Sequence, residues 1–369
     1  MRVLITGARA PAALHLARLL HGAGHHVVMA DGLRRTVSGV SRACASFVHL
    51  PAANGDAGTY AAAIRSAITT HEISLVIPTC EEVFHLAAIW ADTPMGAPLF
   101  APELATVLAA HNKYTFIETA KTFGLPVPQT RLLTSAQDLE AVRHHAASLV
   151  FKPVWSRFAR DVLIRPERIT FTPSPERPWV AQDFVAGTEV CVYAIAHAGQ
   201  VAALSAYRPT YRAGKGAGIA FVPVSDRAID RFVATFAAGT GWTGQVSFDL
   251  IVQDDGSIMP LECNPRATSG VHFFRDPDRF APAFFGQGAV APDVIGLQAV
   301  KLALLLYGPA QRPVGVWRDL WRAAEVMHWP GDPAPGRQQL AATLEVAGIA
   351  LRRRISLTAA STFDIEWNG

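Results

Sequence analysis

Two acidic residues and one amide stand in two short apolar segments of the sequence. Asp249 lies in the first segment, and Glu262 and Asn264 lie in the second, with an Asp-Asp-Gly turn between the segments. This pattern predicts a β-hairpin, because glycine accepts the backbone angles of a tight turn. Strand alternation puts Glu262 and Asn264 on one face, and pairing can bring Asp249 beside them. Carboxylate and amide oxygens suit Mg²⁺ bound jointly with substrate phosphates, although a surface hairpin with solvated carboxylates remains the alternative.

Two cations extend this candidate site. Arg266 follows Asn264 by two residues on the same face, and its planar guanidinium suits an acyl phosphate or a carboxylate. Lys152 is embedded in the hydrophobic run Leu-Val-Phe-Lys-Pro. An unpaired ammonium in a core is costly, so we expect Lys152 to face an anion such as a phosphate.

The N-terminal residues predict the domain that must lie beside this site. Residues 2–6 read as a strand, residues 12–20 as a helix, and residues 27–30 as a second strand that ends in Asp31. This order opens a doubly wound α/β unit. An NAD(P)-dependent oxidoreductase is the rival interpretation, but the loop after the first strand lacks the GxGxxG pattern. Glu81 follows a later strand and is a candidate substrate contact, or else an acid that complements a helix dipole.

Further candidates lie on either side of the predicted hairpin. A glycine-rich basic segment over residues 207–218 contains Arg208, Arg212 and Lys215, which we interpret as a flexible stretch near a carboxylate substrate. His272 follows the hairpin and is a candidate rim contact, with ordinary polar packing as its alternative. Residues 281–369 read as helices followed by a strand-like tail over residues 355–365. The three arginines at 352–354 most simply form a solvated face.

Taken in order, these motifs resemble the ATP-grasp superfamily of carboxylate-amine ligases. The resemblance covers roughly residues 1–275, and its Glu-x-Asn-Pro-Arg motif is shared with the carbamoyl-phosphate synthase and biotin carboxylase branch. The chain departs from the superfamily in the lid after Lys152, where residues 154–161 contain no glycine. Arg157 and Arg160 are candidate replacements as phosphate donors. The residues that carry the resemblance are Lys113, Lys152, Gln182 to Glu189, Asp249, Glu262, Asn264 and Arg266.

The resemblance implies ATP and Mg²⁺ as cofactors, with Mn²⁺ as a possible substitute. It implies that Lys113 and Lys152 hold the phosphates and that Glu189 holds the ribose. It also implies that the adenine lies against Gln182, Asp183, Phe184 and Val185. The implied fold class is α/β, with a doubly wound parallel-sheet domain followed by an α+β ATP-grasp fold and a helical extension. The expected units are residues 1–110, 111–185, 186–280 and 281–369.

The activity that the resemblance implies is ATP-dependent ligation. A carboxylate attacks the γ-phosphate to give an acyl phosphate and ADP, and an amine then displaces phosphate. Two alternatives stay open: a carboxylase or carbamoyl-phosphate-like enzyme, and an ATP-binding regulatory module without catalysis. The identity of the carboxylate and the amine does not follow from these motifs, since the acceptor pocket is built by other loops.

The amino-acid composition bears on which kinds of molecule the chain binds. The chain has 369 residues, of which 50% are hydrophobic and 17% charged, and its net charge is +3. These values predict buried cores in two or three domains, and they give no indication of a nucleic-acid or membrane partner. The sequence begins with a strand and its four cysteines show no metal spacing, so we expect a cytoplasmic protein. A homodimer is possible through the C-terminal extension.

Overall fold

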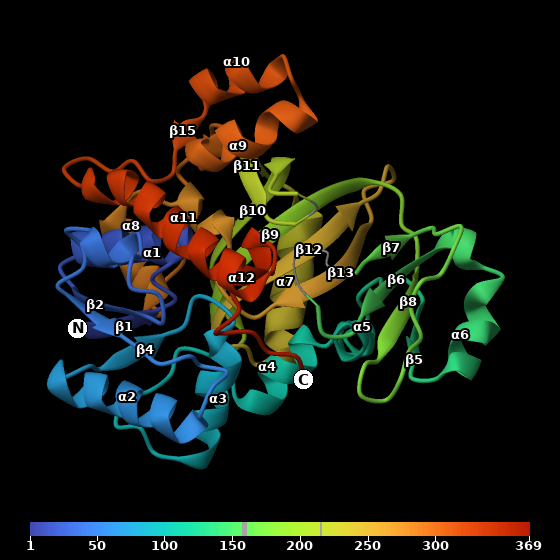
Figure 1. The fold of residues 1–369 in the computed structure, drawn as a ribbon, viewed down its shortest axis with the longest axis horizontal. Helices are drawn as coiled ribbons and strands as arrows, with labels where there is room; N and C mark the ends of the chain where they lie inside the picture. The colour runs from blue at the N-terminus through green and yellow to red at the C-terminus, as the bar shows by residue number, and fades with distance from the viewer. Residues whose placement is uncertain (157–160, 215) are drawn as a thin grey trace.

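The computed structural model describes residues 1–156, 161–214 and 216–369 (Figure 1). Its N-terminal domain is built on a parallel sheet of strand order β3-β2-β1-β4. Alternate residues of β1 serve two cores: Val3 and Ile5 pack under α1, while Leu4 packs with α2 and α3 on the opposite face. The elements are β1 (Arg2–Thr6), α1 (Pro11–Gly22), β2 (His26–Asp31), β3 (Ser46–His49), α2 (Ala57–Thr70), β4 (Leu75–Ile77), α3 (Glu82–Asp92) and α4 (Leu104–His111). The predicted doubly wound unit is therefore confirmed.

A small antiparallel sheet follows, with strand order β5-β8-β6-β7. Its strands close over a compact core in which Phe151 and Trp179 are almost fully buried. Asn112 caps the helix that leads into this unit, because its side-chain oxygen accepts the backbone N–H groups of Tyr114 and Thr115. The elements are α5 (Lys113–Thr122), β5 (Thr130–Leu133), α6 (Ala136–Arg143), β6 (Leu149–Pro153), β7 (Leu163–Ile164) and β8 (Trp179–Asp183).

The largest sheet has strand order β13-β12-β9-β10-β11-β14-β15. The predicted hairpin is confirmed as β12 and β13, and α7 packs over the sheet through Phe232 and Phe236. The basic segment expected to be flexible is instead strand as far as Arg212, because it pairs with β11 up to that residue. The elements are β9 (Thr188–His197), β10 (Gln200–Arg212), β11 (Gly218–Val224), α7 (Arg227–Thr240), β12 (Gly244–Val252), β13 (Ile258–Asn264), β14 (Gln298–Ala299) and β15 (Ala324–Glu325).

The C-terminal extension returns to the N-terminal domain (Figure 1). Its helices are α8 (Pro277–Phe284), α9 (Lys301–Gln311), α10 (Gly315–Arg322), α11 (Ala334–Arg353) and α12 (Leu357–Ala360). The prediction of a strand over residues 355–365 is wrong. Ser356 caps α12 by accepting the Ala359 N–H, and Ile365 ends in the core beneath α2 and α3 rather than at a sheet edge. No helix in the described ranges is long and apolar enough to cross a bilayer.

Candidate active site

The hairpin brings the three predicted metal ligands together. Asp249 and Glu262 are direct cross-strand partners in the β12–β13 register. The Asn264 amide nitrogen lies 3.4 Å from an Asp249 oxygen and 3.5 Å from a Glu262 oxygen. These distances are at the outer limit of hydrogen bonding, so the Asn264 amide satisfies neither carboxyl group, while the two carboxyl groups share a hydrogen bond with each other. The alternation that grouped them also turns Cys263 into the core, as expected.

The two carboxyl groups have opposite electrostatic environments. Burial and the nearby Glu262 charge raise the pKa of Asp249 to about 7. Burial also opposes ionisation of Glu262, but Lys113, the hydrogen bond with Asp249 and Lys152 outweigh it and lower its pKa to about 2. The pair therefore resists carrying two negative charges unless a cation joins it.

Lys113 supplies positive charge from behind the hairpin. Its ammonium lies 3.3 Å from a Glu262 oxygen and donates a 2.7 Å hydrogen bond to the Ser156 carbonyl. The side chain is 3% exposed and does not line the cavity in front of the hairpin. Lys113 therefore pairs with Glu262, which is itself a candidate metal ligand. The predicted contact between Lys113 and the phosphates stays a prediction.

Lys152 projects from β6 toward the same hairpin. Its ammonium donates to the Gln182 side-chain oxygen at 2.8 Å and to the Leu261 carbonyl at 3.3 Å. Gln182 is held in turn, because its amide nitrogen donates to the Thr130 hydroxyl at 3.0 Å. Burial lowers the pKa of Lys152 to about 8, and repulsion from Lys113 adds to that effect against the attraction of the acidic pair. Gln182 therefore positions the Lys152 ammonium. This role of Gln182 was not predicted from the sequence.

One cavity of about 450 Å³ joins these groups. A volume of this size suits a small-molecule ligand. Apolar side chains form part of its wall, and the Val185 backbone N–H has no partner among the described residues. The predicted site residues that line it are Lys152, Gln182, Asp183, Phe184, Val185, Glu189, Arg212, Asp249, Glu262, Asn264 and Arg266.

At the far wall of the cavity, β9 adds two side chains on one face. Glu189 accepts a hydrogen bond from Arg212 at 2.5 Å, which fixes the carboxylate at the cavity edge. Cys191 is the register partner of Asp249, and the donor atoms of Glu189, Cys191 and Asp249 lie within 4.8 Å of one another. Cys191 was missed as a site residue, yet its position two residues after Glu189 on a strand was a sufficient signal.

Arg266 closes the row of polar groups along β13. Its guanidinium donates to the Asn264 side-chain oxygen at 3.3 Å, and its backbone N–H donates to the Asn264 carbonyl at 2.8 Å. Ser247 donates from β12 to the Arg266 carbonyl at 2.9 Å. The backbone of Arg266 is thus fixed while its side chain faces the cavity.

Other predicted substrate residues lie elsewhere. His272 is buried, and its ring packs edge-on to His15 at 4.7 Å, so the predicted rim contact is wrong and the packing alternative holds. Arg208 is exposed and does not line the cavity, because strand alternation turns it away from Tyr207, which does. Glu81 is buried at the start of α3, also outside the cavity lining. Lys215 lies outside the described residues, as do Arg157 and Arg160.

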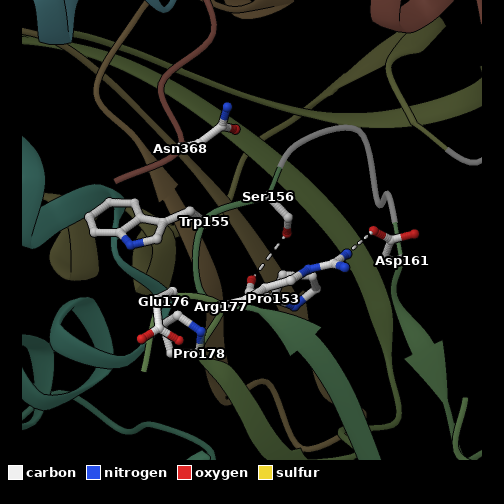
Figure 2. A pocket seen from close by; sticks show the side chains of 8 residues that line it. All are labelled: Pro153, Trp155, Ser156, Asp161, Glu176, Arg177, Pro178 and Asn368. Atoms are coloured by element: carbon white, nitrogen blue, oxygen red, sulfur yellow. Dashed lines mark hydrogen bonds and ion pairs between the residues drawn. The ribbon is translucent and has the colours of Figure 1, made fainter. Parts of the chain in front are cut away.

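A second hollow of about 430 Å³ lies beyond Lys152 (Figure 2). Pro153, Trp155 and Ser156 line one side of it, and Asn368 from the C-terminal extension reaches the same hollow. Arg177 and Asp161 also line the hollow, and Arg177 donates to Asp161 at 2.9 Å. The segment after Lys152 is therefore in contact with the end of the chain.

Comparison with known proteins agrees with the fold described above. A family model described as ATP-grasp domain matches residues 110–270. An L-amino acid ligase from Bacillus licheniformis is similar in structure, with 17% identity and a TM-score of 0.55 over 73% of this chain and 68% of that one. An N5-carboxyaminoimidazole synthetase from Staphylococcus aureus has 12% identity and a TM-score of 0.62 over 85% and 86% of the two chains. The biotin carboxylase domain of a Hydrogenobacter thermophilus 2-oxoglutarate carboxylase has 12% identity and a TM-score of 0.60 over 80% and 73%. At these identities the likeness concerns the fold.

Proposed function

We propose that the chain belongs to the ATP-grasp superfamily, whose family model matches residues 110–270, and that it is an ATP- and Mg²⁺-dependent ligase that joins a carboxylate to an amine and releases ADP and phosphate. One observation carries the proposal. A single cavity is lined both by the predicted nucleotide residues and by the acidic hairpin with Arg266. A nucleotide and a carboxylate bound there would meet at the hairpin.

The donor set fits a hard divalent cation. Asp249 and Glu262 offer carboxylate oxygens, and a half-turn of the Asn264 amide exchanges its nitrogen for its oxygen. The raised pKa of Asp249 reflects the cost of two adjacent negative charges, which a cation would remove. Bound Mg²⁺ would offset the charge that develops on the phosphate oxygens.

The side chains of this chain have separable roles in the proposed reaction. Lys152 would hold a phosphate oxygen, since its ammonium is fixed by Gln182 at the cavity wall. Glu189 would bind the ribose hydroxyls, and the free Val185 N–H would bind the adenine edge. Arg266 would stabilise the acyl phosphate and the tetrahedral species that follows it.

The proposed chemistry has two steps. A carboxylate oxygen attacks the γ-phosphorus, and the bond between the γ-phosphorus and the bridging oxygen of ADP breaks. The amine then attacks the acyl carbon, phosphate leaves, and the amine nitrogen loses a proton. The acceptor would lie near Arg266 and the loop between β4 and α3, because Gln245 beneath the hairpin donates to the Pro78 carbonyl at 2.8 Å. Glu81 begins the helix after that loop, so its substrate role stays part of the proposal.

The direct test is ADP and phosphate release from ATP and Mg²⁺ with amino acids and other carboxylates offered singly and in pairs. Turnover that requires a carboxylate and an amine together supports the ligase. Tight ATP binding without release in any pair would instead support the non-catalytic module.

A carboxylase is the second candidate, because the fold also matches N5-carboxyaminoimidazole synthetase and biotin carboxylase structures. A dependence on bicarbonate distinguishes a carboxylase from a carboxylate-amine ligase. ADP release that depends on bicarbonate and incorporates labelled carbon into the acceptor would replace amide formation by carboxylation. A ligase shows no such dependence in bicarbonate-depleted buffer.

We also propose the domain boundaries of the chain, its location and its oligomeric state. We retain the four units with boundaries near residues 110, 185 and 280, and a location in the cytoplasm. A homodimer is proposed by analogy with the 2-oxoglutarate carboxylase domain, whose structure is described as a dimer. Light scattering of the purified chain tests that state.

A further inference from the structure

A third pocket lies between the N-terminal domain and the C-terminal extension, away from the nucleotide cavity. Its volume is about 450 Å³, and it shares no lining residue with that cavity. One wall is the loop after β2, from Gly32 to Arg34, together with His49 at the end of β3. The opposite wall is α11 and the segment around Phe363. The carboxyl ends of parallel strands are where doubly wound sheets hold their ligands.

The pocket is cationic. Arg34 comes from the β2 loop, while Arg352 and Arg353 come from the last turn of α11, and all three are exposed. None of these guanidinium groups forms an ion pair with another residue in the described ranges. Arg353 instead lies over the Phe363 ring, 4.3 Å from its centroid. Three arginines thus converge on one hollow with their donors available.

The acid in the pocket lining does not neutralise these arginines. Both carboxylate oxygens of Glu345 accept backbone N–H groups, from Arg34 at 3.1 Å and from Arg35 at 2.7 Å. The carboxylate therefore holds the β2 loop against α11 and fixes the width of the pocket. Because Glu345 accepts these backbone N–H groups, the Arg34 side chain is left exposed at the pocket.

The floor of the pocket is apolar. Leu33 and Ile349 belong to one buried cluster, and Phe363 packs against that cluster. A bare inorganic anion would use only the arginines, whereas an organic phosphate would use the floor as well. The combination matches the usual composition of metabolite pockets, which are apolar with a few directed polar groups.

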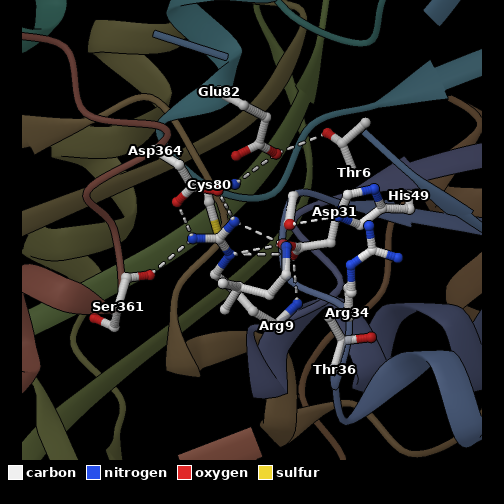
Figure 3. A network of polar contacts seen from close by, with 12 residues as sticks. Thr6, Arg9, Asp31, Arg34, Thr36, His49, Cys80, Glu82, Ser361 and Asp364 are labelled. Atoms are coloured by element: carbon white, nitrogen blue, oxygen red, sulfur yellow. Dashed lines mark hydrogen bonds and ion pairs between the residues drawn. The ribbon is translucent and has the colours of Figure 1, made fainter. Parts of the chain in front are cut away.

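The neighbouring part of the strand-end crevice is closed. Arg9 bridges Asp31 and Asp364 there, and the remaining space is about 10 Å³, enough for roughly one water molecule (Figure 3). In the same view, Arg34 and His49 lie on the other side of Asp31 from Asp364. The space available to a ligand of this domain is therefore on the side of the crevice where Arg34 lies.

We propose that the pocket between the β2 loop and α11 binds a small organic phosphate, with Arg34, Arg352 and Arg353 holding the phosphate group and Phe363 contacting the organic part. Guanidinium groups bind phosphate through paired, charge-assisted hydrogen bonds. This inference does not depend on the proposed ligase activity, because the site shares no residue with the nucleotide cavity.

Isothermal titration calorimetry with ribose 5-phosphate tests the proposal, with ADP and Mg²⁺ present in excess to occupy the nucleotide cavity. We expect binding by the native chain, no binding of ribose, and about a tenfold loss of affinity in Arg34→Gln and in Arg353→Gln. Arg337→Gln, on the same helix but outside the pocket, is the matched control and should bind as the native chain does.

Two results would overturn the proposal. One is the absence of heat of binding for ribose 5-phosphate, and also for glycerol 3-phosphate, at millimolar concentration. The other is equal affinity in the native chain and in the double variant Arg34→Gln/Arg353→Gln. Circular dichroism melting of each variant checks that the fold is retained, and failure of ADP release in a separate assay leaves these outcomes unaffected.

Discussion

Two charged crevices of this molecule differ in how their polar groups are satisfied. In the N-terminal domain, Arg9 contacts Asp31 and Asp364 at 2.6 Å each, and Glu82 accepts hydrogen bonds from Thr6, Thr79 and Cys80. Figure 3 shows this first network. At the hairpin, the Asn264 amide nitrogen lies 3.4 Å from an Asp249 oxygen and 3.5 Å from a Glu262 oxygen, and the two carboxyl groups share a hydrogen bond. In the first network Arg9 is paired with two carboxylates without a ligand, although one Glu82 oxygen has no partner in the described part of the chain. At the hairpin the Asn264 amide nitrogen has only long contacts with the two carboxyl groups.

This difference separates stability from function. A buried network whose polar groups are paired fixes the arrangement of its elements. Polar groups that lack close partners can instead form favourable contacts when a ligand binds. The closed crevice therefore predicts a structural role for Arg9, Asp31 and Asp364. The open one predicts cation and nucleotide binding.

The strongest test of the comparison removes a charge from the open site. Glu262→Gln should lower ADP release by at least about a hundredfold, because the carboxylate that holds the cation is lost. Steady-state release with the identified substrate pair measures this. Asp254→Asn, on the exposed turn of the same hairpin, is the control and should be fully active. Normal turnover by Glu262→Gln would refute the metal assignment.

A second variant addresses the nucleotide wall. Lys152→Ala should weaken ATP binding by about tenfold to a hundredfold, since a charge-assisted hydrogen bond to a phosphate disappears. Calorimetric titration with ATP and Mg²⁺ gives the affinity, and Lys121→Ala on the exposed side of α5 serves as the control. An unchanged affinity in Lys152→Ala contradicts the phosphate role.

The closed crevice should respond in stability rather than in nucleotide binding. Asp364→Ala should lower the free energy of unfolding by about 2 kcal/mol, because Arg9 keeps Asp31 but loses a buried partner. Urea denaturation measures the change. Glu140→Ala removes an exposed ion pair with Arg143 and should cost less than about 0.5 kcal/mol. If the two variants were equally stable, the structural role of the network would be wrong.

The smallest expected effect is a pH dependence of stability. Burial, together with the positive charges of Arg275 and Arg18, lowers the pKa of His15 to about 3. A histidine side chain in the unfolded chain has a pKa near 6.5. Between these values the unfolded state binds a proton that the folded state does not, so stability falls as the pH falls, by about 1.4 kcal/mol per unit. His15→Gln should reduce this slope in urea denaturation at pH 7, 6 and 5, while the neighbouring His272, whose pKa burial also lowers, keeps its own contribution. His144→Gln, at an exposed position, should leave it unchanged.

The parts that were predictable from sequence depend on local pattern. Strand alternation together with hairpin pairing placed Asp249, Glu262 and Asn264 together, and the cost of an unpaired ammonium in a hydrophobic strand predicted that Lys152 faces an anion. His272 was misplaced because burial against His15 depends on residues more than 250 positions away, as the 2.6 Å contact from His15 to the Phe274 carbonyl shows.

The C-terminal extension was the least predictable region. Residues 355–365 have strand-like composition, yet they fill a crevice of the first domain, which only the three-dimensional arrangement reveals. The Arg9–Asp364 contact could not be inferred from either local sequence.

That contact also bears on the order of folding. Arg9 and Asp364 are 355 positions apart, and Arg9 also donates to the Ser361 carbonyl at 2.9 Å. Contacts of such separation form late, because chain closure must precede them. The N-terminal domain therefore completes this polar crevice only after residues 361–364 have joined it. Without them Arg9 has Asp31 as its carboxylate partner but lacks Asp364, so the domain is less stable before these residues dock than after.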